Sequence, residues 1–212
     1  MIAGTRALHR SSLAVSAALV LILALAPPAS ATTKDVSIEN FEFVPPSITA
    51  AMGVTIDWTN NDIPPHTARS DERLPNGKPG IRVFHTGNLD FGDSAERRLP
   101  WAATYPYHCA YHFGMEASVA TRMTIVDAST GETERYRVTW ARDDPRTGML
   151  FDVQMKAPGG TFVHFYRGTG RSRLFTPGAD GTYEFHSRLV KLNGSAVAAS
   201  TMYSPTASVT VG

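Results

Sequence analysis

Apolar and polar residues alternate in several short stretches between residues 34 and 127. The alternation is clearest at residues 54–58, where Val, Ile and Trp are separated by Thr and Asp, and it is less regular at 123–126. Gly, Pro and Asn interrupt these stretches. A period of two is typical of a β-strand with one buried and one exposed face. We therefore predict that this part of the chain is built of short β-strands.

A small, polar segment at residues 128–132 follows these stretches, and we interpret it as a linker between two domains. The chain beyond it, residues 133–212, resembles a fibronectin type III domain. The resemblance rests on a core tryptophan in an early strand, Trp140, and on Tyr183, which has the sequence context of a tyrosine corner. Residues 207–211 resemble the last strand of that fold. The resemblance implies an immunoglobulin-like β-sandwich and indicates no activity.

The N-terminal residues have the pattern of a signal peptide. Arg6 and Arg10 precede an apolar run at residues 13–26, and a cleavage site of the A-x-A type ends at Ala31. The apolar run is shorter than the roughly 20 residues that span a bilayer. We therefore predict a signal peptide at residues 1–31 and a mature chain without an integral membrane segment. Such a chain is exported to the periplasm, the cell surface or the extracellular space.

The charge of the chain is close to balanced. It contains 20 Lys and Arg against 19 Asp and Glu. Because the predicted leader holds two of the basic residues and none of the acidic ones, the remainder has 18 against 19 and a net charge of −1. This balance argues against nucleic acid binding and against a polybasic surface for membranes.

Cys109 is the only cysteine, and His112 and Met115 follow it at short, regular spacing. Thiolate and thioether suit Cu(I) whereas imidazole suits Cu(II), so one Cys, two His and a weak Met suit a copper ion that cycles between both states. The run supplies three of these ligands. The remaining histidine is expected far upstream on another strand, and His66, which follows two prolines, is the best candidate.

The segment at residues 34–127 resembles the cupredoxins, the small blue copper proteins that include plastocyanin, pseudoazurin and amicyanin. The matching pieces are residues 65–67, 84–89 and 105–109, and the last of these continues to His112 and Met115. Two residues separate Cys from His and two separate His from Met, a spacing similar to that of the short ligand loop of amicyanin.

This resemblance implies a Greek-key β-sandwich, so the predicted fold class is all-β, with a cupredoxin β-sandwich followed by a fibronectin type III-like β-sandwich. It also implies one bound copper ion of type 1. The predicted ligands of this ion are His66, Cys109, His112 and Met115.

Two other histidines lie close to these motifs in the sequence. His108 directly precedes Cys109, but neighbouring residues of a strand point to opposite faces, so we do not expect His108 to bind the same ion. His85 lies in the segment 84–89. We favour a surface or loop role for His85 over a metal role and leave its function open.

A copper ion with four protein ligands has no open position for a substrate. We therefore predict an electron carrier rather than an enzyme, with a redox partner that docks transiently near His112 through a small apolar face. One alternative is copper storage, delivery or resistance, although the methionines are scattered and form no Met-rich tract. Another is an accessory subunit of a copper redox enzyme. The second domain is predicted to be a spacer or a module that contacts a protein or the cell surface.

Overall fold

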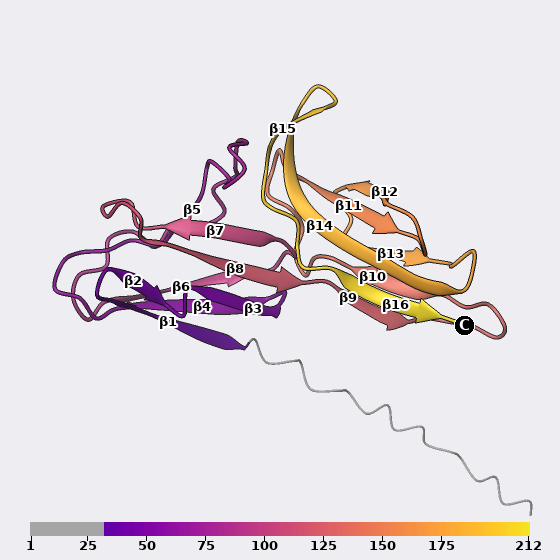
Figure 1. Ribbon diagram of the computed structural model, residues 1–212, viewed down its shortest axis with the longest axis horizontal. Helices are drawn as coiled ribbons and strands as arrows, with labels where there is room; N and C mark the ends of the chain where they lie inside the picture. The colour runs from indigo at the N-terminus through magenta and orange to yellow at the C-terminus, as the bar shows by residue number, and fades with distance from the viewer. Residues whose placement is uncertain (1–31) are drawn as a thin grey trace, which may run out of the picture. The chain divides into compact units, whose positions relative to one another are not determined.

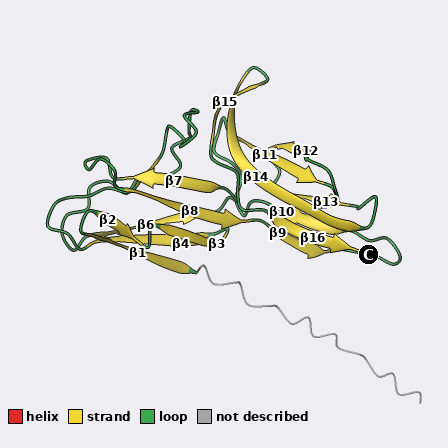
Figure 2. Ribbon diagram, in the orientation of Figure 1, coloured by secondary structure: helices red, strands yellow, loops and turns green. Residues whose placement is uncertain are grey.

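The computed structural model describes residues 32–212, and the predicted signal peptide lies outside the described residues. Every regular element in this part of the chain is a β-strand, which confirms the all-β fold class (Figures 1 and 2). Within residues 32–212 there is accordingly no apolar helix of membrane-spanning length.

The first half of the described chain forms two facing sheets. One has the strand order β2-β1-β4-β6 and consists of β1 (Thr33–Glu39), β2 (Glu42–Val44), β4 (Val54–Asn60) and β6 (Ser94–Leu99). The other has the order β3-β8-β7-β5 and consists of β3 (Ser47–Ala51), β5 (Arg69–Ser70), β7 (Thr104–His108) and β8 (Glu116–Arg122). The pairs β1–β4 and β3–β8 are parallel, and the other neighbours are antiparallel.

The core between these sheets follows the alternation seen in the sequence. Strand β4 buries every second side chain, and Trp58 is its largest. Strand β7 buries Tyr105 and Tyr107 in the same manner. The rings of Trp58 and Tyr107 meet edge to face with centroids 5.7 Å apart, so the two sheets are joined by aromatic packing. This packing supports the loops at the end of β7.

The second half forms another pair of sheets. The smaller has the order β13-β10-β9 and consists of β9 (Thr124–Asp127), β10 (Tyr136–Thr139) and β13 (Ser172–Phe175). The larger has the order β12-β11-β14-β15, with β16 also paired to β14, and consists of β11 (Leu150–Lys156), β12 (Phe162–Gly168), β14 (Gly181–Asn193), β15 (Ala196–Ser200) and β16 (Ala207–Val211).

Two of the residues singled out in the sequence lie in the core of this second half. Trp140 is fully buried. The hydroxyl of Tyr183 donates a hydrogen bond to the carbonyl of Ala179 at 3.0 Å and accepts the N–H groups of Gly178 and Ala179. Tyr183 therefore ties the start of β14 to the loop before it.

The chain passes from the first pair of sheets to the second between β8 and β9. Only Met123 separates β8 from β9, and β9 pairs with β10 rather than with any strand of the first half. Residues 128–132, interpreted above as a linker, lie in the turn that joins β9 to β10, where Thr130 and Thr133 form a bridge. A local alternation of apolar residues does not reveal which sheet a strand joins, because its hydrogen-bond partner is distant in sequence.

The two halves also contact each other directly and belong to one compact unit, Ala31–Gly212. The hydroxyl of Ser187 in β14 donates to the carbonyl of Ala102 at 2.6 Å, and this bond is buried. Nε of Arg142 donates to the carbonyl of Met52 at 2.8 Å. The halves are thus joined by buried polar contacts as well as by the chain itself.

Candidate metal centre

The loop between β7 and β8 carries three of the predicted ligands and is closed by its own backbone. The N–H of Cys109 donates to the carbonyl of Met115 at 3.0 Å, and the N–H of Met115 donates to the carbonyl of His112 at 3.3 Å. Gly114 has a φ of 81°, a conformation that glycine adopts without steric cost. The loop therefore turns tightly and brings the histidine back over the cysteine.

His66, from the loop between β4 and β5, joins this group. Its Nδ1 lies 3.1 Å from Nδ1 of His112, and the two nitrogens lie 3.7 Å and 3.4 Å from Sγ of Cys109. Around a metal bound at about 2.0 Å by nitrogen and about 2.3 Å by sulfur, angles of about 110–120° space the nitrogens by about 3.3–3.5 Å and nitrogen from sulfur by about 3.5–3.7 Å. The observed distances of 3.1, 3.4 and 3.7 Å lie within about 0.2 Å of these ranges, so the three donor atoms are close enough to bind a single ion.

The predicted ligands differ in exposure. His66 is 0% exposed, Cys109 3% and Met115 4%, whereas His112 is partly exposed. Burial, and secondarily the neighbouring His112, lower the pKa of His66 despite the nearby carboxylate of Asp62. A neutral imidazole is the form that binds a metal. The structure brings His66, Cys109 and His112 together as one group of donor atoms, and it places Met115 at the buried end of their loop.

Hydrogen bonds from polar side chains hold the two ligand loops in place. The hydroxyl of Thr67, next to His66, accepts the N–H of Ala110, next to Cys109, at 2.8 Å. The buried side-chain amide of Asn60 donates to the carbonyls of Pro64 and Leu89, each at 2.9 Å. These contacts fix the backbone on both sides of the cluster.

Asp62 is a residue near the site that the sequence analysis missed. Its Oδ2 lies 3.3 Å from Nε2 of His66, although the angle falls short of a hydrogen bond. Its two oxygens accept the N–H groups of Asn40 and Phe41, each at 2.8 Å. Partial burial raises the pKa of Asp62, but these N–H groups outweigh it and hold the pKa below its usual value. Asp62 therefore stays ionised beside the ligand.

The turn that Asp62 holds places an aromatic ring over the cluster. Asn40 and Phe41 have φ values of 53° and 61°, which non-glycine residues rarely adopt. The ring of Phe41 lies edge to face with those of His66 and His112, at centroid distances of 5.6 Å and 4.9 Å. No sequence signal identified this contact, because residues 40 and 41 lie more than sixty positions before the ligand loop.

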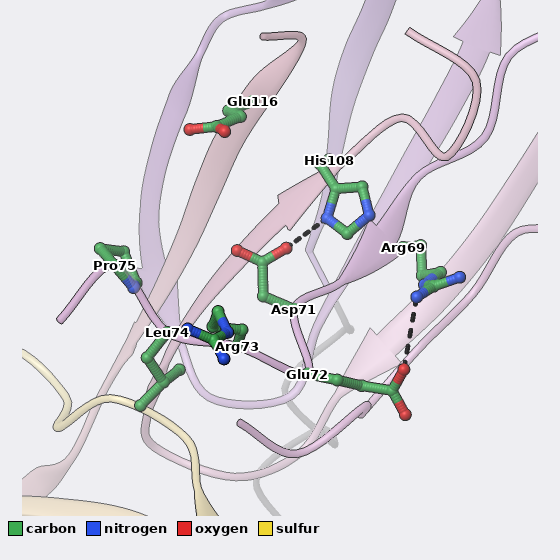
Figure 3. Close-up of a pocket in the computed structure, with 8 residues that line it drawn as sticks. All are labelled: Arg69, Asp71, Glu72, Arg73, Leu74, Pro75, His108 and Glu116. Atoms are coloured by element: carbon green, nitrogen blue, oxygen red, sulfur yellow. Dashed lines mark hydrogen bonds and ion pairs between the residues drawn. The ribbon is translucent and has the colours of Figure 1, made fainter. Parts of the chain in front are cut away.

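The side chain of His108 points away from the cluster, as the strand geometry predicted. Its Nδ1 lies 2.5 Å from Oδ1 of Asp71, in a surface depression of about 450 Å³ (Figure 3). The other residues that line this depression are Arg69, Glu72, Arg73, Leu74, Pro75 and Glu116. His108 and Cys109 thus face different surroundings, although they are adjacent in the chain.

His85 also lies apart from the cluster. Its Nδ1 accepts the N–H of Gly87 at 2.7 Å, and burial, followed by the charges of neighbouring arginines, lowers its pKa. This geometry stabilises the loop after residue 84 and agrees with the loop role favoured from the sequence.

Comparison with known proteins gives the cluster its context. Residues 30–122 match the family described as copper binding proteins, plastocyanin/azurin family. Over 74 residues the chain is 35% identical to plastocyanin from Scenedesmus fuscus, a match that spans 34% of this chain and 76% of that protein. The chain belongs to the plastocyanin/azurin family. The family binds copper, and its plastocyanin-like members are electron carriers rather than enzymes.

Solved structures of cupredoxins are also similar to this chain. A purple cupredoxin from Nitrosopumilus maritimus is 27% identical, with a TM-score of 0.38, over 42% of this chain and 98% of that one. A Cu(I) amicyanin mutant is 21% identical, with a TM-score of 0.37, over 42% of this chain and 82% of that one.

Proposed function

We propose that this chain is an exported blue copper protein that binds one type 1 copper ion and carries single electrons. The observation that supports this most strongly is the convergence of Nδ1 of His66, Nδ1 of His112 and Sγ of Cys109 at ligand spacing. The proposed fourth ligand is Met115, buried where its loop closes. When bound, copper supplies a centre that is oxidised and reduced by one electron.

The proposed ligands differ in exposure, and this difference indicates where electrons enter and leave the centre. His66 is enclosed, and His112 is the ligand that reaches the surface, so we propose that electrons enter and leave at the edge of His112. Large apolar side chains are exposed on the loops around this edge, namely Phe41, Ile63, Phe91, Tyr111 and Phe113. A compact apolar face suits a brief encounter with a redox partner, because such complexes bury little area.

Preorganisation favours electron transfer over copper delivery. The bonds of Asn60 and the bond from Ala110 to Thr67 hold the ligand loops through groups of the protein itself. A rigid site reorganises little when the copper changes charge, whereas delivery requires ligands that open to release the ion. Storage or delivery is therefore the alternative that the experiment has to exclude.

The deciding experiment compares the copper-loaded protein with its Cys109→Ser variant. The wild type is expected to show intense visible charge-transfer absorption and rapid electron self-exchange, and the variant to be colourless because serine supplies no thiolate. A colourless wild type overturns the copper assignment. Slow self-exchange, combined with ready transfer of Cu(I) to a competing chelator, identifies a copper store instead.

For the second half of the chain, we propose a fibronectin type III-like β-sandwich that acts as a spacer or docking module. The tie between Tyr183 and Ala179 and the pair of three- and five-stranded sheets with a buried Trp140 support this proposal. Export through a signal peptide at residues 1–31 is part of the same proposal. Sequencing the N-terminus of the protein recovered outside the cytoplasm tests it, with residue 32 expected first.

A further inference from the structure

A second surface depression, which none of the proposed copper ligands lines, is rich in arginine. It has a volume of about 310 Å³, and its polar side chains are those of Arg82, His85, Arg97 and Arg146. Arg82 and His85 lie between β5 and β6, Arg97 lies in β6, and Arg146 lies between β10 and β11. The depression is therefore formed by both halves of the chain, and the residues that line it include no Asp or Glu.

The partly buried side chain of Arg97 is held by backbone carbonyls. Its Nε and Nη2 donate to the carbonyl of His85 at 3.1 Å and 2.7 Å, and Nη2 also donates to the carbonyl of Thr86 at 3.1 Å. These bonds fix the guanidinium group, but a carbonyl carries no net charge. The positive charge of Arg97 is therefore held in position without being neutralised.

Arg146 is held in a similar way from the second half of the chain. Its Nη2 donates to the carbonyl of Val83 at 2.6 Å, and its guanidinium carbon lies 5.6 Å from the ring centroid of Trp101. Asp143 and Asp144, which precede it in the same loop, form ion pairs with arginines outside the depression. Among residues 32–212, no carboxylate forms an ion pair with Arg146.

A single carboxylate pairs with the arginines of this region. Oε2 of Glu72 accepts a hydrogen bond from Nη2 of Arg82, and it also accepts Nη2 of Arg69 at 3.3 Å (Figure 3). Arg97 and Arg146 bring the number of guanidinium groups to four, so three positive charges (four minus one) are left without a paired carboxylate.

His85 adds an uncharged donor to the depression. Its Nδ1 accepts the N–H of Gly87, so the proton of the neutral ring is on Nε2. Burial, followed by the charges of Arg69 and Arg82, lowers the pKa of His85 and keeps the ring neutral. The depression therefore combines fixed positive charge with N–H donors, which is the complement of an oxyanion.

We propose that this depression binds a phosphate group, either as inorganic phosphate or as a phosphate monoester whose remainder extends into the solvent. Guanidinium groups bind phosphate oxygens through paired, charge-assisted hydrogen bonds. Several guanidinium groups around one depression suit a doubly charged oxyanion better than a single carboxylate. Because Arg82 and Arg146 come from different halves of the chain and are both exposed, a bound phosphate bridges the halves and stays accessible at the surface.

Titration calorimetry and thermal unfolding of the full chain with inorganic phosphate, at constant ionic strength in chloride, test the proposal. We expect one phosphate bound per chain and a higher unfolding temperature, because a ligand that binds only the folded state stabilises it. Glycerol 3-phosphate distinguishes the two sources: tighter binding than inorganic phosphate indicates a monoester, and equal or weaker binding indicates free phosphate. If neither ligand gives heat or raises the unfolding temperature, the proposal is wrong.

Three variants locate the binding. Arg82→Gln changes an exposed side chain and should weaken phosphate binding about three- to tenfold. Glu72→Gln removes the shared carboxylate and should tighten binding about two- to fivefold, a gain that damage to the fold does not produce. Arg122→Gln, at an exposed position of β8, is the matched control and should leave the affinity unchanged. Equal weakening by Arg82→Gln and Arg122→Gln, or no gain from Glu72→Gln, overturns the proposed site.

Discussion

The carboxylate of Asp62 lies between the side chain of His66 and the turn that carries Phe41. One of its oxygens is 3.3 Å from Nε2 of His66, and the pair of oxygens binds the N–H groups of Asn40 and Phe41. A carboxylate next to the outer nitrogen of a metal-binding imidazole orients the ring and makes it a stronger donor. One side chain thus positions both the proposed ligand and the ring that covers it.

Replacing Asp62 is expected to affect both roles. Asp62→Ala removes the acceptor of two backbone N–H groups, so the free energy of unfolding should fall by about 1–3 kcal/mol, and copper should be lost faster to a chelator. Urea titration and chelator kinetics measure the two effects. Asp127→Ala is the matched control, because Asp127 also accepts a backbone N–H in an exposed turn, that of Ser129. If both variants release copper at the same rate, Asp62 does not orient His66.

His66 lies in the donor cluster whereas His108 pairs with Asp71 outside it, and this difference gives a second prediction. His66→Ala opens the proposed site and should loosen copper strongly, whereas His108→Ala removes a side chain that pairs with Asp71 and should leave the visible spectrum nearly unchanged. Copper titration followed by absorption spectroscopy compares them. Equal loss of copper in the two variants would contradict the proposed ligand set.

The buried Met115 allows a test of the weak fourth ligand. Met115→Leu keeps the apolar volume and removes the sulfur, so the protein should remain blue, and its reduction potential should rise because Cu(II) loses more from the missing donor than Cu(I) does. Redox titration of wild type and variant gives the shift. An unchanged or lower potential would argue against a bond from Met115 to copper.

Stability in acid should depend on a histidine in the second half of the chain. His186 is stacked between Phe162 and Tyr203, with ring centroids 3.9 Å away on each side, and burial followed by the charge of Arg188 lowers its pKa to about 4. The unfolded chain, with an ordinary pKa of about 6.5, binds the proton more readily. Stability is therefore complete above about pH 6.5 and declines as the pH falls towards 4.

The magnitude of this loss is reduced by solvent, because His186 is only partly buried, and we expect about 1–2 kcal/mol. Urea titration between about pH 6.5 and 4 measures this loss of stability. The copper-free protein is used so that release of copper in acid does not contribute. His186→Phe keeps a ring in the stack and should flatten the decline, whereas His164→Phe, at an exposed position on β12, which β11 separates from β14, should not. The same decline in both variants would assign it to other groups.

The sequence predicted the proposed site residues that lie close together in the chain. Cys109, His112 and Met115 are close in the chain, and the single cysteine drew attention to them. His66 could be inferred because the remaining ligand had to be a histidine from elsewhere. Asp62 and Phe41 could not be inferred, because their contacts with the cluster depend on how a hairpin turn packs against a loop.

The strands, like the site residues, could be predicted only where the signal is local in the sequence. Alternation at residues 54–58 predicted β4, since one face of that strand is buried and the other is exposed. The place where the chain leaves the first pair of sheets has no signal in the sequence, because β8 and β9 follow each other almost without interruption and differ only in their hydrogen-bond partners.

A single buried thiol limits how the centre can be lost to disulfide formation. Because Cys109 has no second cysteine in the chain, no internal disulfide can capture it, and a disulfide with another molecule requires its loop to open first. Any oxidant that reaches Sγ therefore has to pass the same packing that excludes water. Alkylation of this one thiol, read by mass spectrometry, counts the molecules in which the loop has opened.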